Sequence, residues 1–476
     1  MFENLSKLLK IPETANPTVK KDAVAALLKT SPEALAAFEK AYSKRPIDPD
    51  GDMNSRQAVD MRHAECGLVL ERSNENVDAI INRVVDELLA QTSVYVFDGN
   101  LGKTEKKLLA LPAGTQMVCQ EDVSTLPMEL RPQLTGELMS VDIAEPSYQS
   151  LLFFWKEYMT EKNPKRRKLA YNQFRQGLDI LDLDPVTYEI LGMNRNSMGN
   201  WLPQLVEACK GQDFFRIPAT TIAKVPLTLL QLTRQEYMGL TPTTLAIVDQ
   251  WAHKAFNLND AKEYFIKTGT YSSKFDFRNA HVHGEKEVQE LGEYLLYIHY
   301  QALQMASPLC TPCVYGVSTT NEWVVREFIP DKEGNPCIYE GLPLHTEYRV
   351  FVDCDSKEVL GIAPYWEPET MKHRFGHQKD ANDPQKVHDY IIYKAHEETL
   401  MGRFEENKDW VVDHIKEILK GLNLTGQWSI DVMQNGDEFW IIDMAVAESS
   451  YFYDGYVPKE LRRPVSENWV PQLPES

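Results

Sequence analysis

The sequence has few positive charges for its length and no long apolar run. Its 50 Lys and Arg residues are outnumbered by 70 Asp and Glu, which gives a formal net charge of −20. A chain this acidic is not expected to bind duplex DNA or an anionic membrane. No segment approaches the ~20 consecutive apolar residues of a membrane span, and the N-terminus lacks a signal-peptide pattern. We therefore expect a cytoplasmic protein with no membrane partner and no nucleic-acid partner.

Cysteine is also scarce: the seven cysteines are odd in number and scattered, which favours reduced thiols over a disulfide framework. Cys310 and Cys313 have the Cys-x-x-Cys spacing of a redox pair or of half a zinc site. No second pair has this spacing, and Cys337, His345 and Cys354 are only loose completions. Two structural thiols beside a Pro turn are the simpler interpretation.

Several other short patterns admit both a functional and a plain interpretation. Residues 99–104 resemble a phosphate-binding P-loop, but two residues separate the glycines where that motif has four. The basic run at residues 165–168 is either a solvated helix face or an RNA contact. The histidine pairs at 281 and 283, and at 373 and 377, are typical of surface loops, although metal binding or substrate contact is compatible with their spacing.

Residues 427–444 contain the most informative pattern in the chain. Two apolar, β-prone runs flank an Asn-Gly turn signal, which predicts a β-hairpin. Each run carries one acidic residue, Asp431 or Asp443, where a buried strand favours an apolar one. A buried carboxylate is costly unless it is paired, and Mg²⁺ held by carboxylates and substrate phosphates would pair both. The alternative is a surface hairpin with two solvated carboxylates, which Trp428, Trp440 and their apolar neighbours disfavour.

The register of this hairpin decides whether the two aspartates can share a metal. A two-residue loop centred between Asn435 and Gly436 would point them to opposite faces, because strand side chains alternate. An odd loop centred on Gly436 would place Asp431 and Asp443 on one face as diagonal neighbours, with Cβ atoms about 7 Å apart. We expect the odd loop.

Three earlier segments carry further signals. A short strand at residues 264–267 ends in Lys267 and is followed by a loop of small and hydroxylated residues that ends in Lys274. Such a loop lets backbone N–H groups and lysines approach phosphates. Residues 322–329 predict a buried strand that leads into a loop, and residues 347–353 and 358–363 predict a second hairpin.

In this order, the motifs resemble the ATP-grasp superfamily. The final strand–turn–strand is similar to that of D-alanine–D-alanine ligases, and the Val-Val-Arg-Glu-Phe-Ile segment with its following hairpin resembles the ATP-grasp cell-division-cycle assembly factors. The resemblance covers roughly residues 187–455. It implies an α/β (α+β) fold in which two subdomains grip a nucleotide, with ATP and Mg²⁺ as cofactors.

The resemblance also implies a role for each matching residue. The expected nucleotide-binding residues are Lys267, Ser272, Ser273, Lys274, Glu327, Phe328, Ile329 and Glu347. In this scheme Lys267 contacts phosphates, the backbone of Glu327 and Ile329 reads adenine, and Glu347 serves the ribose. Arg349 and Lys274 are the expected catalytic residues, and Asp431 and Asp443 the metal ligands.

The implied activity is an ATP- and Mg²⁺-dependent ligase that activates a carboxylate as an acylphosphate for attack by an amine or similar nucleophile. The alternative is an ATP-binding assembly factor that grips a peptide or protein without ligation. One departure bears on this choice: the family has Asn two residues after its last acidic ligand, and here that position is Ala445.

The same motifs predict the domain organisation. Residues 1–185 form a separate, mostly helical N-terminal region with some strand. Residues 186–260 form the N-terminal α/β subdomain of the ATP-grasp unit, 261–335 the nucleotide-gripping subdomain, and 336–476 the C-terminal subdomain with the metal site.

Overall fold

The structure is a computed structural model. It describes residues 75–102, 116–118, 161–163, 166, 188, 191–192, 194–234, 240, 242–306, 320–375 and 383–463. Cys310, Cys313, His377 and most of the basic run at 165–168 lie outside these ranges, so the predictions made for them are not addressed by the structure.

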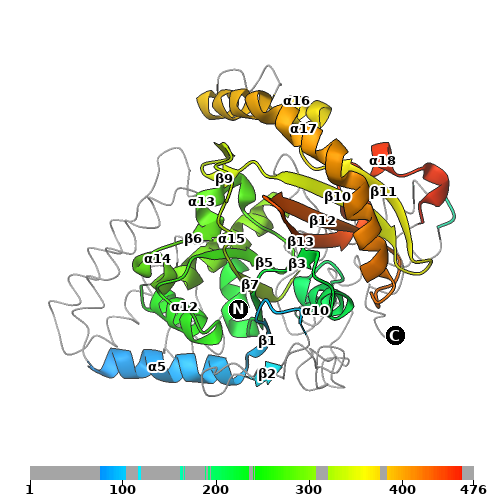
Figure 1. The fold of residues 1–476 in the computed structure, drawn as a ribbon. Helices are drawn as coiled ribbons and strands as arrows, with labels where there is room; N and C mark the ends of the chain where they lie inside the picture. Colours follow the sequence, from blue (N-terminus) through cyan, green and yellow to red (C-terminus); the bar gives the residue numbers. More distant parts are fainter. Residues whose placement is uncertain are drawn as a thin grey trace.

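The described strands form two larger sheets, consistent with the predicted α+β fold (Figure 1). The six-stranded sheet contains, in spatial order, β2 (Gln116–Val118), β1 (Ser93–Phe97), β4 (Thr220–Lys224), β7 (Glu322–Glu327), β5 (Tyr264–Thr268) and β6 (His281–Val282). The five-stranded sheet contains β11 (Glu358–Pro364), β10 (Thr346–Asp353), β12 (Gln427–Asn435), β13 (Glu438–Val446) and β3 (Phe215–Arg216). A short ribbon pairs β8 (Cys337–Ile338) with β9 (Leu342–Pro343).

The helices of the described ranges cover both sheets. They are α5 (Glu75–Ala90), α10 (Met198–Ala208), α11 (Leu227–Leu230), α12 (Pro242–Ala255), α13 (Phe277–Ala280), α14 (Glu285–Gln289), α15 (Leu291–Ala306), α16 (Pro368–Phe375), α17 (Pro384–Leu419) and α18 (Tyr453–Tyr456). Among them, none combines the length and the apolar character that a membrane crossing requires.

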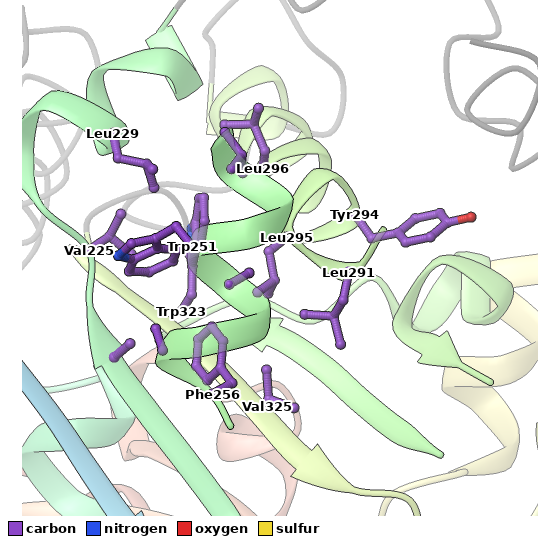
Figure 2. Packing of buried hydrophobic residues seen from close by; sticks show 14 of the residues in the cluster. Val225, Leu229, Trp251, Phe256, Leu291, Tyr294, Leu295, Leu296, Trp323 and Val325 are labelled. Carbon is purple, nitrogen blue, oxygen red and sulfur yellow. The ribbon is translucent and has the colours of Figure 1, made fainter. Parts of the chain in front are cut away.

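One face of the six-stranded sheet packs against α5, α12 and α15. Trp251 of α12 lies edge-on to Trp323 of β7 with ring centroids 5.6 Å apart, and Leu291 and Leu295 of α15 close the same core (Figure 2). The neighbours of Trp323 in the strand point the other way because strand side chains alternate. β1 precedes residue 186 and pairs with β4, so this sheet draws on both sides of the predicted boundary.

The five-stranded sheet packs one face against α10 and α17, as the side chains of alternate strand residues show. Trp428, Ile430 and Val432 of β12 join Ile415 of α17 and Trp201 of α10 in one buried cluster. α17 is long and runs beside β10 and β11 (Figure 1). The intervening residues of β12, including Asp431, therefore lie on the opposite face of this sheet.

The hairpin of β12 and β13 differs from the predicted form. Its turn is the two residues Gly436 and Asp437, not an odd loop centred on Gly436, and Gly436 takes a positive φ of 63°. A β-bulge at Ile442 inserts one extra residue into β13, so Asp431 pairs directly with Asp443. The predicted shared face is therefore present, but an even turn and a bulge produce it.

Candidate functional site

A cleft lies between the two sheets, on the face of the six-stranded sheet opposite α12 and α15 and on the face of the five-stranded sheet opposite α17. It is lined by Pro218, Phe265, Lys267, Ser272, Lys274, Phe277, Arg326, Glu327, Phe328, Ile329, Leu342, Pro343, His345, Glu347, Asp431, Met433, Ile442 and Asp443. One part of this lining is charged and the other is mainly apolar and aromatic, and the two parts differ in what they can bind.

Lys267 and Arg326 bring positive charge from the six-stranded sheet. Both are almost completely buried, on the same face of neighbouring strands. The Lys267 ammonium donates to Asp443, with Nζ 3.2 Å from Oδ1 and 3.3 Å from Oδ2. Burial lowers the pKa of Lys267, although Asp443 opposes the shift, and burial lowers the pKa of Arg326 to about 10.

Arg326 is held in place by two hydrogen bonds but keeps one donor without a partner. Its Nε donates to Thr220 Oγ1 at 3.1 Å, and Nη1 donates to the carbonyl of the bulged residue Ile442. Its Nη2 is buried and has no hydrogen-bond partner among the described residues. An unsatisfied buried donor of a charged group is costly, so this atom is suited to an anionic ligand in the cleft.

Carboxylates come from the five-stranded sheet. Asp431 and Asp443 lie side by side, and Arg349 continues the same row across β10. Arg349 donates to both oxygens of Asp431, from Nε at 2.8 Å and from Nη2 at 2.6 Å. Burial would lower the pKa of Arg349, but Asp431 raises it overall. Asp431 is nearly buried, whereas the side chain of Asp443 is 41% exposed.

Glu347 adds a third carboxyl group at this charged end. Its side chain is buried, and Oε2 has no hydrogen-bond partner among the described residues. Burial raises the pKa of Glu347 to about 7, although Lys274 opposes the shift. For Lys274, burial acts downward, but Tyr365, Glu347 and Asp431 outweigh it and the pKa is raised.

The loop after β5 turns back sharply and carries Lys274 into the cleft. Thr268 Oγ1 accepts hydrogen bonds from the N–H groups of Thr270 and Tyr271, at 3.3 and 2.9 Å, which fixes the turn. Ser272 lines the cleft. Ser273 is buried, and its hydroxyl lies 3.1 Å from Gln301 Oε1.

The apolar end of the cleft lies where β7 ends. Phe265, Phe277 and Phe328 line it together with Leu342 and Met433. The N–H of Glu327 donates to Ala219 and that of Phe328 to Glu263, at 2.9 and 3.1 Å. The N–H of Ile329 has no hydrogen-bond partner within the described ranges, so it is an available donor beside the aromatic rings.

Most of the predicted site residues meet in this cleft, but two do not line it. Arg349 was expected to face phosphate or substrate, and instead its guanidinium is taken up by Asp431. Ser273 was expected over the triphosphate, and instead it bonds to α15 through Gln301. Glu347 was expected at the ribose, and the structure places it among Lys274, Asp431 and Arg349 at the charged end.

Several residues that line the cleft were not among the predicted site residues. Arg326 gave the same signal as the aspartates, a charge within an apolar strand, and was treated only as part of a motif. Phe265, Phe277, Met433 and Ile442 gave no signal, because an apolar residue in a strand or helix resembles an ordinary core residue.

The remaining histidine prediction is partly addressed by the structure. His281 lies 2.9 Å from Glu263 and stacks on Phe328 with ring centroids 3.8 Å apart. His283 lies 3.3 Å from Glu287. Within the described ranges, neither histidine belongs to a group of side chains that could jointly hold a metal.

Comparisons with known proteins give a limited result. No protein-family model and no curated protein matches the chain. Among solved structures, C-terminally truncated Cdc123 from Schizosaccharomyces pombe matches with a TM-score of 0.31 and 15% identity, over 54% of this chain and 85% of that one. A second structure of Cdc123 from the same organism matches with a TM-score of 0.30 and 14% identity, over 53% and 84%. At this level of similarity, function has to be argued from the cleft itself.

Proposed function

We propose that this protein binds ATP together with Mg²⁺ in the cleft between its two sheets. The observation that carries the proposal is the division of charge. The six-stranded sheet and the loop after β5 supply Lys267, Lys274 and Arg326, and the five-stranded sheet supplies Asp431 and Asp443. A magnesium nucleotide has the complementary division, with anionic phosphates and a cationic metal.

The phosphate part of the proposal rests on donors that are buried and partly unsatisfied. Arg326 Nη2 has no partner in the described chain, and Lys267 is held only by Asp443 among the ion pairs described. A triphosphate supplies acceptor oxygens for both, and buried charge-assisted hydrogen bonds are strong. Lys274 adds a third cation from a turn that a ligand can contact from the side of Ser272.

The metal part rests on the chemistry of the donor set. Asp431 and Asp443 offer adjacent carboxylate oxygens, and Glu347 offers a buried oxygen without a partner. Oxygen ligands of this kind suit Mg²⁺, which needs only one or two protein carboxylates when phosphates complete its shell. Asp431 and Asp443 would hold the ion, which would neutralise phosphate charge when bound. Ala445 supplies no side-chain ligand, so the protein would offer one metal ligand fewer than the ATP-grasp pattern, which has Asn at this position.

The base would lie at the apolar end. Adenine stacks favourably on aromatic rings, and Phe265, Phe277 and Phe328 offer three of them. The N–H of Ile329 would donate to a ring nitrogen of the base. Backbone recognition of this kind depends on the main chain rather than on the side chain of Glu327.

We favour a nucleotide-dependent binding protein of the assembly-factor type over a ligase. Arg349, the residue expected to act on the substrate, is committed to Asp431. An ATP-dependent carboxylate–amine ligase is the second candidate, and a specific observation supports it. Lys274 and Glu347, whose Oε2 has no hydrogen-bond partner among the described residues, both line the charged end, where an acylphosphate would form and a proton would leave the attacking amine.

Calorimetric titration with ATP, with and without Mg²⁺, tests the proposal. We expect saturable binding that Mg²⁺ tightens, and GTP should bind less tightly because the Ile329 donor is placed for adenine. Absence of ATP binding at millimolar concentration would overturn the proposal. Release of ADP, measured with a panel of carboxylates and amines, distinguishes the two candidates, because only a ligase turns over ATP in step with a joined product.

A further inference from the structure

A row of alternating cations and aromatic rings runs from the charged end of the cleft to the protein surface. The Arg349 guanidinium lies 4.9 Å from the centre of the Tyr365 ring, and Lys274 Nζ lies 4.0 Å from the same ring. Lys274 Nζ is also 5.9 Å from the ring of Phe275, over which Arg374 lies at 4.8 Å. The inner members are buried or half-buried, whereas the Phe275 side chain is 43% exposed.

Arg374, at the outer end of this row, forms no ion pair among the described residues. Its Nη1 donates to the hydroxyl of Tyr339 at 3.3 Å. The carboxylates of the adjoining segments are engaged elsewhere, because Arg278 contacts both Asp276 and Glu340, at 3.2 and 2.8 Å. In a chain with a formal net charge of −20, an arginine near the surface that has no carboxylate partner among the described residues is available to an external anion.

The turn that carries Tyr339 is held in an unfavourable conformation. Tyr339 and Glu340 have positive φ angles of 50° and 61°, and Gly341 follows at 127°. Two hydrogen bonds hold the turn, from the N–H of Phe277 to Tyr339 O and from the N–H of Tyr339 to Asp389 Oδ2. Backbone strain of this kind costs about 1–3 kcal/mol per residue and clusters at functional sites. In this turn the Tyr339 ring lies 5.1 Å from the Phe275 ring, and its hydroxyl accepts the hydrogen bond from Arg374.

We propose that Phe275, Tyr339 and Arg374 form a docking site for a peptide segment of a partner protein, in which a carboxylate lies next to an apolar side chain. The carboxylate would pair with the Arg374 guanidinium, and the apolar side chain would cover the exposed face of Phe275. Charge complementarity with Arg374 favours the carboxylate, and the 43% exposed side chain of Phe275 favours the apolar neighbour. The assignment does not depend on ATP binding.

A pair of matched probes tests the docking site. They are the blocked tetrapeptides acetyl-Leu-Asp-Phe-Gly-amide and acetyl-Leu-Asn-Phe-Gly-amide, which differ only in charge. Ligand-observed NMR titration without nucleotide should show that the Asp peptide binds about fivefold more tightly, as expected for one partly exposed ion pair. Arg374→Gln should abolish this preference, and Phe275→Ser should weaken both peptides.

Lys372→Gln is the matched control. Lys372 lies on the same helix, is exposed and is already paired with Glu369 at 3.6 Å, so its loss should leave the preference unchanged. The docking site is refuted if the two peptides bind wild type equally, if neither binds at millimolar concentration, or if the preference survives Arg374→Gln. ATP titration of the same variants is read separately, so failure of nucleotide binding and failure of docking give different results.

Discussion

The two walls of the cleft are built alike but charged oppositely. Both are antiparallel strands with one face buried under helices, and both place charged side chains on the opposite face. The six-stranded wall offers Lys267 and Arg326, and the five-stranded wall offers Asp431 and Asp443. Arg349 is the exception on the acidic wall, and there its guanidinium is paired with Asp431.

The opposite charges of the two walls explain how the cleft can be stable without a ligand and still bind one. Lys267 and Asp443 join the two walls directly, which satisfies both charges in the free protein. A phosphate would replace Asp443 as the partner of Lys267, and a metal would replace Lys267 as the partner of Asp443. Ligand binding would thus exchange partners rather than expose unpaired charge, which keeps the desolvation cost small.

The largest effect should separate the two aspartates. Asp431→Asn leaves the nearly buried Arg349 guanidinium without its carboxylate, and breaking such a pair typically costs about 3–5 kcal/mol of unfolding free energy. Asp443→Asn should cost much less, because its side chain is 41% exposed. Urea denaturation of both variants measures the difference.

The double variant Asp431→Asn with Arg349→Met is the control for this prediction, because removal of both partners should recover most of the lost stability. Equal destabilisation by the two single aspartate variants would contradict the difference between a nearly buried carboxylate paired with Arg349 and a partly exposed one.

The next effect concerns the basic wall. Lys267→Met should weaken ATP binding by about 100-fold, roughly the contribution of one buried charged hydrogen-bond donor. Lys262→Met is the control: this lysine pairs with Glu327 at 3.4 Å at the rim, with both side chains about half exposed. Calorimetry should find the control within about twofold of wild type. If the two variants weakened ATP binding equally, the loss of net charge rather than the position of Lys267 would explain the weaker binding.

A third effect tests the apolar end, where recognition is expected from the main chain. Ile329→Pro removes the N–H donor and should weaken ATP binding by about tenfold. Glu327→Gln keeps the backbone and should have little effect. Unchanged affinity for Ile329→Pro, in a variant with a wild-type unfolding transition, would place the base elsewhere.

The last effect is a dependence on pH. Because the pKa of Glu347 is raised to about 7 in the folded chain, the folded state binds the extra proton between that value and its ordinary value of 4.5. Stability contributed by this group therefore falls as pH rises from about 4.5 to 7. The unfolding free energy of Glu347→Gln should therefore rise relative to wild type across this window, by about 1 kcal/mol per pH unit at most. A difference in unfolding free energy between Glu347→Gln and wild type that does not change with pH would contradict the raised pKa of Glu347.

The charged part of the site could be predicted because a charge in an apolar strand is costly and therefore conspicuous. That argument identified Asp431, Asp443 and Lys267, and it applied equally to Arg326. It could not reveal that Arg349 forms an ion pair with Asp431, because a sequence does not show whether a carboxylate will pair with Arg349 or with Lys267. The aromatic lining was missed because apolar residues on a cleft and in a core look the same.

The fold was predictable at the level of class and of local strands, including β5, β7, β10 and the final hairpin. The pairing of β1 with β4 was not, because it joins segments that are more than a hundred residues apart and leaves no local pattern. The bulge in β13 was also invisible, since Ile442 reads as one more apolar strand residue.

The bulge at Ile442 changes which face of the sheet the residues after it occupy. With a two-residue turn and no bulge, Asp443 would point to the face of the sheet opposite Asp431. The one residue inserted at Ile442 returns Asp443 to the same face. A hairpin with an odd turn and no bulge also places the two aspartates on one face. The number of residues between the two aspartates is therefore a weak guide to related sites. At this spacing of the two aspartates, the shared face requires either an odd turn or one bulge, but not both.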